Sequence, residues 1–229
     1  PSCASPADWS TPRAPTRIYG NTWYVGTQCI AAILVTSDDG HMLIDAGVPQ
    51  AVPHVRASIE RLGFKLADVK LILNSHAHYD HAGGIAELQR ASGATVAASP
   101  ASAAVLEAGA SGPDDPQYGV IEAFPAVASV RVLADSEVVR VGSLALTAHW
   151  TPGHTRGGTS WSWRSCEASR CLDIVYADSQ TPVSADNFFY TRSATYPNAI
   201  ADFRRGHARL EALRCDYPWA SDRLHRFAI

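Results

Sequence analysis

Residues 69–84 have the sequence VKLILNSHAHYDHAGG, in which an apolar run leads straight into three histidines and an aspartate. The run is typical of a buried β-strand, and the closing glycines allow a sharp turn into a helix expected near Ile85. His76 and His78 lie two positions apart, so on an extended strand end both side chains can point toward one ion. Imidazole nitrogens suit zinc, whereas magnesium and calcium prefer oxygen ligands. The stretch therefore predicts a metal site where the strand ends.

The next two polar residues of this stretch, Asp80 and His81, fall on the turn that follows the strand. A carboxylate and an imidazole at this place can face a second ion beside the first. The alternative is a polar loop that is rich in histidine by chance. The two glycines that follow at once favour a built turn instead.

A second motif, TPGHTRGG at residues 151–158, places His154 on an expected loop after a strand. Taken alone, His154 would be an ordinary turn histidine. Catalytic zinc sites commonly have three protein ligands and one position open to water. Because His76 and His78 supply only two ligands, we expect His154 to complete their site. His207, in contrast, lies on the apolar stripe of an expected helix, which predicts a core histidine.

A third polar cluster, DSQT at residues 178–181, follows the apolar stretch IVYA and is therefore also expected at a strand end. The carboxylate of Asp178 and the neighbouring hydroxyls could contact metal, water or substrate. An ordinary polar turn is the alternative. No Gly-x-Ser-x-Gly elbow occurs in the sequence, so a serine hydrolase is not indicated.

Composition and charge limit the classes of partner. The 229 residues are 46% hydrophobic with a net charge of -3, which is typical of a globular protein. No run of Lys and Arg could follow a phosphate backbone, so we expect no nucleic-acid partner. No stretch reaches the roughly 18 apolar residues of a membrane span, and no charged-then-apolar leader opens the chain. We therefore expect no membrane partner and a mature soluble form.

The five cysteines form no CxxC pair, so neither a zinc ribbon nor a redox motif is indicated. Cys166 and Cys171 flank four residues between two strand-like runs, a spacing that would join the strands of a hairpin. Cys3 could tie the N-terminal tail to the strand near Cys29. Disulfides imply an oxidising compartment, so we expect a periplasmic or secreted protein, in which Cys215 is left without a partner.

Strands and helices are expected in two successive halves of the chain. Strands are expected within residues 17–45, at 69–73, at 95–98 and within 130–176. Helices are expected at 52–62, 85–90, 101–108 and 198–213. Residues 109–125 show no hydrophobic periodicity, which predicts a loop that could cover an active site. The order predicts an α/β fold of two mixed β-sheets packed face to face with helices outside, in a single domain of residues 1–229.

The three motifs together resemble those of the metallo-β-lactamase superfamily, whose fold is a four-layered αβ/βα sandwich. HxHxDH after a strand, a distant Pro-Gly-His-Thr and an Asp-Ser pair at a later strand end carry the resemblance. Serine rather than cysteine at position 179 is similar to subclass B3, in particular to the Adelaide imipenemase branch. Further matches lie at residues 18–22, 115–118 and 162–166.

The resemblance implies a metal set and a reaction. His76, His78 and His154 would hold a first zinc, and Asp80 and His81 would hold a second. The implied reaction is hydrolysis of the β-lactam amide bond of antibiotics by a metal-bound hydroxide, which Asp80 would orient as the catalytic residue.

The resemblance also implies contacts to the substrate. Ser179 and Thr181 match positions that meet the carboxylate of a β-lactam, and Gln117 lies on a loop that flanks it. The partner would be this small molecule alone, and we expect a monomer.

The C-terminal segment departs from the family pattern after about residue 214. In subclass B3 a further ligand of the second zinc is a histidine shortly after a Cys-Asp pair, and a helical segment with another cysteine follows. Here Cys215-Asp216 is followed by YPWASDRLHRFAI, in which that histidine is missing. His225 could serve instead, water could complete the site, or residues of the natural protein could be absent from this chain. We expect one zinc bound tightly and a second bound loosely.

Other functions stay open. A thioesterase like glyoxalase II or a lactonase belongs to the same superfamily, and in such an enzyme Asp178 would bridge the two metals. The missing histidine also allows a zinc-binding relative with impaired catalysis. A nucleic-acid-processing relative ranks last, because the sequence has no basic surface signal.

Overall fold

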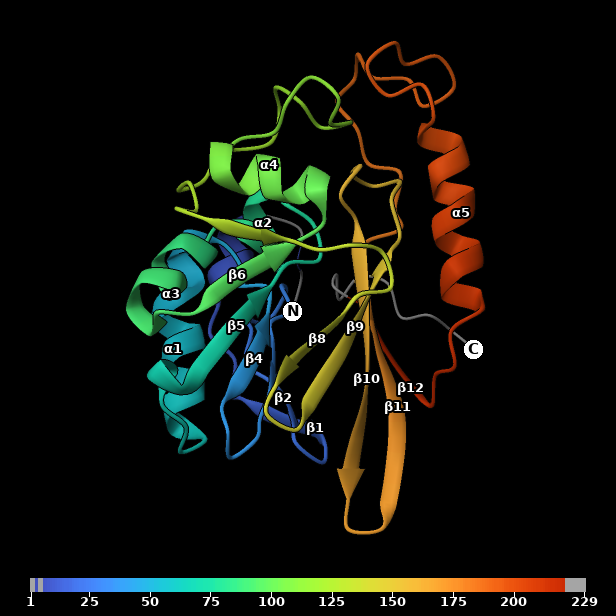
Figure 1. Cartoon of the computed structure of the whole chain (residues 1–229). Helices are drawn as coiled ribbons and strands as arrows, with labels where there is room; N and C mark the ends of the chain where they lie inside the picture. Colours follow the sequence, from blue (N-terminus) through green and yellow to red (C-terminus); the bar gives the residue numbers. More distant parts are fainter. Residues whose placement is uncertain (1–2, 4–5, 221–229) are drawn as a thin grey trace.

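Two mixed β-sheets lie face to face, and helices cover both outer sides (Figure 1). The structure is a computed structural model, and it describes residue 3 and residues 6–220. The layers are helices, a seven-stranded sheet, a five-stranded sheet and one long helix. The predicted αβ/βα sandwich is therefore confirmed.

The seven-stranded sheet has its strands in chain order. They are β1 (Thr16–Tyr19), β2 (Thr22–Tyr24), β3 (Ile33–Val35), β4 (His41–Ile44), β5 (Val69–Leu73), β6 (Thr95–Ala98) and β7 (Val130–Val132). The first four pair antiparallel, and β4 to β7 pair parallel. Parallel neighbours need long crossovers, which here contain the helices of the outer face. These are α1 (Val52–Arg61), α2 (Tyr79–Ala82), α3 (Ile85–Ser92) and α4 (Pro100–Ala108), with 3-10 turns at Pro49–Ala51 and Leu66–Asp68.

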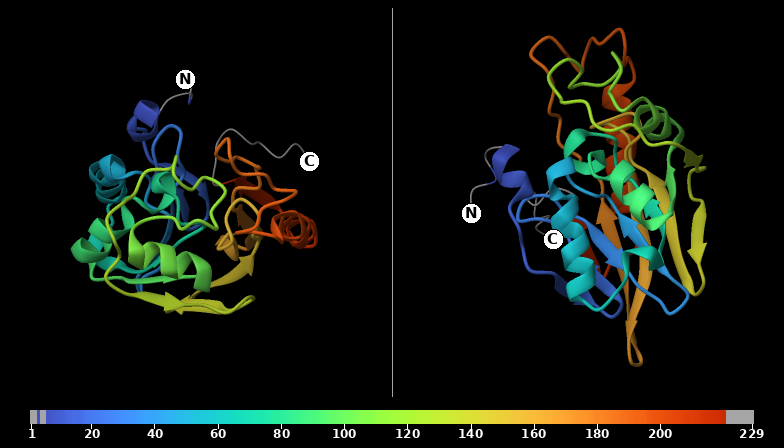
Figure 2. Two further views of the ribbon diagram at one scale, coloured as in Figure 1. Left: turned by 90° about the horizontal axis from the view of Figure 1, so that it is seen from above. Right: turned by 90° about the vertical axis from the view of Figure 1, so that its left-hand side faces the viewer.

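The five-stranded sheet has the order β12-β11-β10-β9-β8. Its strands are β8 (Val138–Val141), β9 (Leu144–Trp150), β10 (Thr159–Glu167), β11 (Arg170–Ala177) and β12 (Tyr217–Ala220). Strand β12 pairs parallel to β11, and the other neighbours are antiparallel. Helix α5 (Ala199–Glu211) lies on the side of this sheet away from the other helices (Figure 2).

The core has two parts, one on each face of the seven-stranded sheet. Leu43 and Ile72 pack toward the helices, whereas their neighbours Ile44 and Leu73 pack toward the five-stranded sheet. Successive strand residues point to opposite faces, so both must be apolar when both faces are covered. This requirement explains why the sequence before the histidine motif is continuously apolar rather than alternating.

Two disulfides bear out the pairing expected from the sequence. Cys3 is bonded to Cys29, Cys166 is bonded to Cys171 across the β10–β11 hairpin, and Cys215 has a free thiol. Within residues 6–220, no helix is both long and apolar enough to cross a lipid bilayer.

Candidate metal centre

Three chain segments bring polar side chains to one end of the two sheets. His76 and His78 follow β5 directly, and Asp80 and His81 lie in or at the start of the single-turn helix α2. His154 lies in the loop after β9. The predicted clustering of these five residues is therefore seen in the structure, whereas their role as metal ligands stays a prediction.

The first cluster is a buried triangle of imidazoles. One candidate ligand atom from each of His76, His78 and His154 lies within 4.8 Å of the others. The ring centroids of the three pairs are 4.9, 4.8 and 4.9 Å apart. Three imidazole rings at nearly equal separations, each with a nitrogen within 4.8 Å of the others, are a suitable set for a tetrahedral ion with one open position.

Each imidazole of the triangle is held from outside by an oxygen acceptor. His76 Nδ1 lies 2.7 Å from Asp178 Oδ1, and His78 Nε2 lies 2.9 Å from Asp115 Oδ2. His154 Nδ1 donates to the carbonyl oxygen of Thr181 at 2.8 Å. A neutral imidazole that donates through one nitrogen carries its lone pair on the other. These contacts therefore orient the three rings as metal ligands are usually oriented.

The second cluster shares a member with the first. Candidate ligand atoms of His76, Asp80 and His81 lie within 4.8 Å of one another. His81 Nε2 is 3.4 Å from Asp80 Oδ2, and the Asp80 side chain is 16% exposed. His225, expected as a substitute ligand, lies outside the described residues.

Asp45 supports the second cluster, a role that sequence reasoning missed. This carboxylate is fully buried at the end of β4, where its Oδ2 is 3.1 Å from His81 Nδ1 and accepts from Tyr176 Oη at 2.9 Å. It also accepts from the backbone and hydroxyl of Ser75, at 2.7 and 2.6 Å. A charged residue that ends a continuously buried strand was the available signal, because such a group needs partners.

Burial and neighbouring charge keep the central histidine neutral. Desolvation lowers the pKa of His76 well below 6.5, and the nearby imidazoles of His81, His154 and His78 lower it further. Asp115 is different, because burial opposes its ionisation. The hydrogen bond and charge of His78, with the backbone amide of Gln117, outweigh burial and lower the pKa of Asp115. The site therefore combines a neutral imidazole with an ionised outer carboxylate.

The residues expected to meet substrate lie around the cluster. Ser179 is buried, and its hydroxyl has no hydrogen-bond partner among the residues that the structure describes. Thr181 contributes its carbonyl to His154, and the Gln117 side-chain amide donates to His78 Nδ1 at 3.3 Å. Gln117 is thus beside the imidazole triangle rather than only on a flanking loop. Their contacts with substrate stay predictions.

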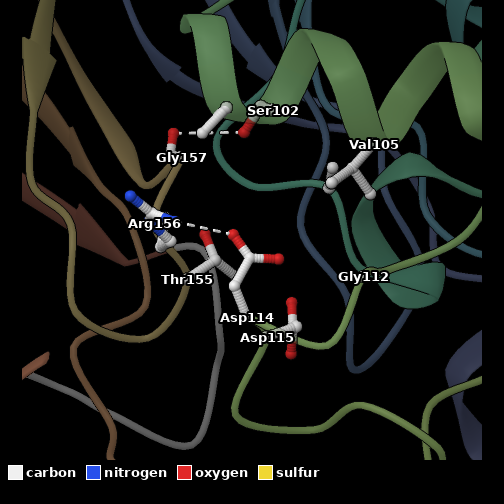
Figure 3. Close-up of a pocket in the computed structure, with 10 residues that line it drawn as sticks. Ser102, Val105, Gly112, Asp114, Asp115, Thr155, Arg156 and Gly157 are labelled. Atoms are coloured by element: carbon white, nitrogen blue, oxygen red, sulfur yellow. Dashed lines mark hydrogen bonds and ion pairs between the residues drawn. The ribbon is translucent and has the colours of Figure 1, made fainter. Parts of the chain in front are cut away.

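Two cavities adjoin this end of the sheets. A small one of about 30 Å³ lies between α4 and the loops that contain Asp114 and Arg156 (Figure 3). A larger one of about 270 Å³ lies between residues 113–118 and residues 187–195, with Phe188, Phe189 and Arg192 in its wall.

Comparison with known families shows which family the chain belongs to. The family described as Metallo-beta-lactamase superfamily matches residues 30–202, which is more than half of the chain. The chain belongs to the metallo-beta-lactamase superfamily.

Solved structures of this superfamily are similar over nearly the whole chain. Rm3 metallo-beta-lactamase is 51% identical, with a TM-score of 0.94 over 97% of this chain and 82% of that one. MEM-A1, a subclass B3 metallo-beta-lactamase from a soil metagenome library, is 49% identical, with a TM-score of 0.92 over 94% and 81%. MIM-1 from Novosphingobium pentaromativorans is 51% identical, with a TM-score of 0.88 over 96% and 80%. The resemblance to subclass B3 is therefore confirmed.

Curated relatives are more distant. A hydroxyacylglutathione hydrolase of Bradyrhizobium sp. (strain ORS 278) is 33% identical over 129 residues, which are 56% of this chain and 41% of that protein. One of Rhodopseudomonas palustris (strain ATCC BAA-98 / CGA009) is 34% identical over 134 residues, 58% and 42% of the two chains. The chain spans about two fifths of the length of these curated relatives.

One prediction about a histidine outside the centre was wrong. His207 is exposed on α5 and is not a core residue, because this helix buries only Ala199 and Gly206 fully.

Proposed function

We propose that this protein is a zinc-dependent hydrolase that cleaves the amide bond of the β-lactam ring in antibiotics. The observation that carries the proposal is the buried triangle of His76, His78 and His154, each held by an outer oxygen acceptor. Its structural relatives, at 49–51% identity, are named metallo-beta-lactamases. Localisation in the periplasm or outside the cell, and a role in antibiotic resistance, are part of the same proposal and fit the two disulfides.

The donor set fits zinc. Neutral imidazoles and one carboxylate are borderline ligands, and the depressed pKa of His76 keeps its nitrogen lone pair available at neutral pH. We assign His76, His78 and His154 to a first ion, and Asp80 and His81 to a second. Bound zinc supplies Lewis acidity, which polarises a carbonyl and makes water more acidic.

The residues of the chain then have separate tasks. The partly exposed carboxylate of Asp80 orients the water that attacks the lactam carbonyl, and the proton of this water passes to the ring nitrogen when the C–N bond breaks. The Ser179 hydroxyl, buried and lacking a partner among the described residues, donates to the carboxylate of the substrate, with Thr181 beside it. Gln117 closes the site from the loop side. Ser179 and the three imidazoles are buried, and burial strengthens the polar contacts that they make.

We expect the two ions to bind with different strength. The second site has Asp80 and His81 within the described residues, and its third ligand is assigned only to His225 or water. A weak second ion would make hydrolysis rise with added zinc, since that site would stabilise charge on the leaving nitrogen.

Thioester hydrolysis is the second candidate, because the curated relatives are named hydroxyacylglutathione hydrolases. A thioesterase of this superfamily would need Asp178 between two metals. Here Asp178 Oδ1 lies 2.7 Å from His76 Nδ1, on the outer side of the imidazole triangle. This position favours the lactamase.

One sample can test both candidates. Zinc content after dialysis is measured together with turnover of a chromogenic cephalosporin and of a glutathione thioester. Cephalosporin turnover that exceeds thioester turnover supports the proposal, and the reverse order contradicts it. No turnover of either substrate with excess zinc would indicate an impaired relative. Two zinc ions retained after dialysis, unchanged in His225→Ala, would contradict the loose second site.

A further inference from the structure

The loop at residues 109–125 is attached to the imidazole triangle at His78, through Asp115 and Gln117. We propose that Asp115 is a positioning residue that couples this loop to the affinity of the first metal site. The inference rests on the proposed metal at His76, His78 and His154, and it adds a residue with no assigned role.

The carboxylate of Asp115 has two partners, one at each oxygen. Its Oδ2 lies 2.9 Å from His78 Nε2, and its Oδ1 accepts from the backbone N–H of Gln117 at 2.8 Å. The residue is only 8% exposed, and both contacts favour its charged form. The same side chain therefore shapes the loop and holds the ring of His78.

His78 meets this loop at both of its ring nitrogens. The Asp115 carboxylate accepts at Nε2, and the Gln117 amide donates to Nδ1 at 3.3 Å. With the proton on Nε2, the lone pair lies on Nδ1, so a metal would bind there in place of the Gln117 amide. A carboxylate at Nε2 makes Nδ1 a stronger electron donor and fixes the orientation of the ring.

The neighbouring residue Asp114 gives a natural comparison. Its Oδ2 pairs with Arg156 Nη1 at 3.0 Å, and both side chains are about half exposed at 43% and 52% (Figure 3). Asp114 belongs to the same loop and has the same charge, but its partner is a cation near the surface. Exposed ion pairs contribute little, typically below about 1 kcal/mol.

The loop also carries a link to the far side of the site. The carbonyl oxygen of Pro116, next to Asp115, accepts from the backbone N–H of Ala185 at 2.8 Å. A metal that requires one orientation of His78 therefore favours one position of two loops. Thermodynamic linkage makes the effect reciprocal, so a change that releases the loop lowers metal affinity.

The test compares Asp115→Ala and Asp115→Asn with Asp114→Ala as the matched control. Zinc affinity is measured by competition with a chromophoric chelator, without any β-lactam present. Loss of an outer partner of a metal-binding histidine typically lowers affinity about 10–100-fold, which is the result expected for Asp115→Ala. Asp115→Asn keeps an acceptor oxygen and should lose less, and Asp114→Ala should stay within about twofold.

A second readout follows the loop itself. Tyr118 is 52% exposed, so chymotrypsin can cut the loop there. Zinc should slow this cleavage in the unaltered chain and in Asp114→Ala, but not in Asp115→Ala at saturating zinc. The intact fold of each zinc-free variant is checked by its urea midpoint, and Asp115→Asn serves if the alanine variant does not fold.

The outcomes separate the two proposals. Equal losses in both alanine variants, or unchanged affinity in both Asp115 variants, would overturn the coupling. A chain that binds zinc but hydrolyses no β-lactam would contradict the proposed function. The coupling would then still be decided by the zinc affinities of the Asp115 and Asp114 variants. A chain without measurable zinc affinity would overturn both.

Discussion

The two halves of the histidine cluster differ in where their support comes from. The His76, His78 and His154 half is built from two segments and held by acceptors from two others, at Asp115 and at residues 178–181. The Asp80 and His81 half comes from one helical turn and is held through Asp45. Within residues 6–220, its third group member is His76, which already belongs to the other half.

This difference should give the two adjacent sites different metal affinities. A histidine is held in the orientation that a metal needs when a separate segment of the chain fixes its second nitrogen. The first half has this support at every member, and the second half has it at His81. Metal should therefore occupy the first half at lower free concentrations than the second.

Removal of a ligand from the supported half should have the largest effect. His154→Ala leaves two imidazoles and should lower both zinc affinity and kcat/KM on a chromogenic cephalosporin by more than about a hundredfold, beyond the loss of an outer partner. His207→Ala, an exposed histidine on α5, is the control and should change neither. Similar activities of the two variants would contradict the assigned triangle.

Asp45→Asn should lower both the stability of the fold and the affinity of the Asp80 and His81 half for its ion. Asp45 has a backbone φ of 58°, a conformation that Asn also tolerates, so the backbone should persist. The lost charge weakens the contacts with His81, Ser75 and Tyr176, and we expect the free energy of unfolding to fall by about 3 kcal/mol. Urea denaturation of the zinc-free protein measures this loss.

The same variant also compares the two metal sites. Zinc titration of Asp45→Asn should show the second ion weakened more than the first. Equal weakening of both ions would mean that Asp45 does not distinguish the halves.

His149, a buried histidine outside the metal centre that is hydrogen-bonded to a hydroxyl rather than to a carboxylate, shows how burial affects protonation. His149 donates or accepts at Ser162 Oγ at 2.7 Å, and burial, with the charge of Arg209, lowers its pKa from 6.5 to about 4. The unfolded chain therefore binds more protons between pH 6.5 and 4, so stability should fall as the pH falls through this range. The contribution is about 2 kcal/mol between pH 7 and pH 4.5.

The measurement is urea unfolding of zinc-free protein at these two pH values. His149→Gln removes the titrating group, so its stability should fall less on acidification than that of the unaltered chain. An equal fall in both proteins would show that His149 does not contribute.

How far the sequence predicts this molecule depends on the distance between partners. The apolar run of β5 and the adjacent histidines were predictable, because strand pattern and ligand spacing are local. Single-turn α2 was expected only as a turn, because four residues carry no periodic signal. Strand β12 was not predicted, since it depends on pairing with β11 about 40 residues earlier in the chain.

The supports of the site show the same limit. Asp45 lies 36 residues from His81, and Asp115 lies 37 residues from His78. No local pattern connects such partners. The prediction for His207 was wrong for a different reason. An apolar stripe predicts that one face of a helix is buried, but not which residues of that face meet the sheet.

The smallest expected effect concerns the larger cavity between the two loops. Arg192 lies over the ring of Phe189 at 4.2 Å and has no ion pair among the described residues, so its charge can meet an anionic substituent of the substrate. Arg192→Gln should lower kcat/KM on carbenicillin about threefold to tenfold more than on benzylpenicillin, which lacks the extra carboxylate. Arg140→Gln, an exposed residue on β8, is the control. An equal decrease of kcat/KM on both penicillins would mean that Arg192 stabilises the conformation of its loop. Substrate selection would then depend on the residues around the imidazole triangle.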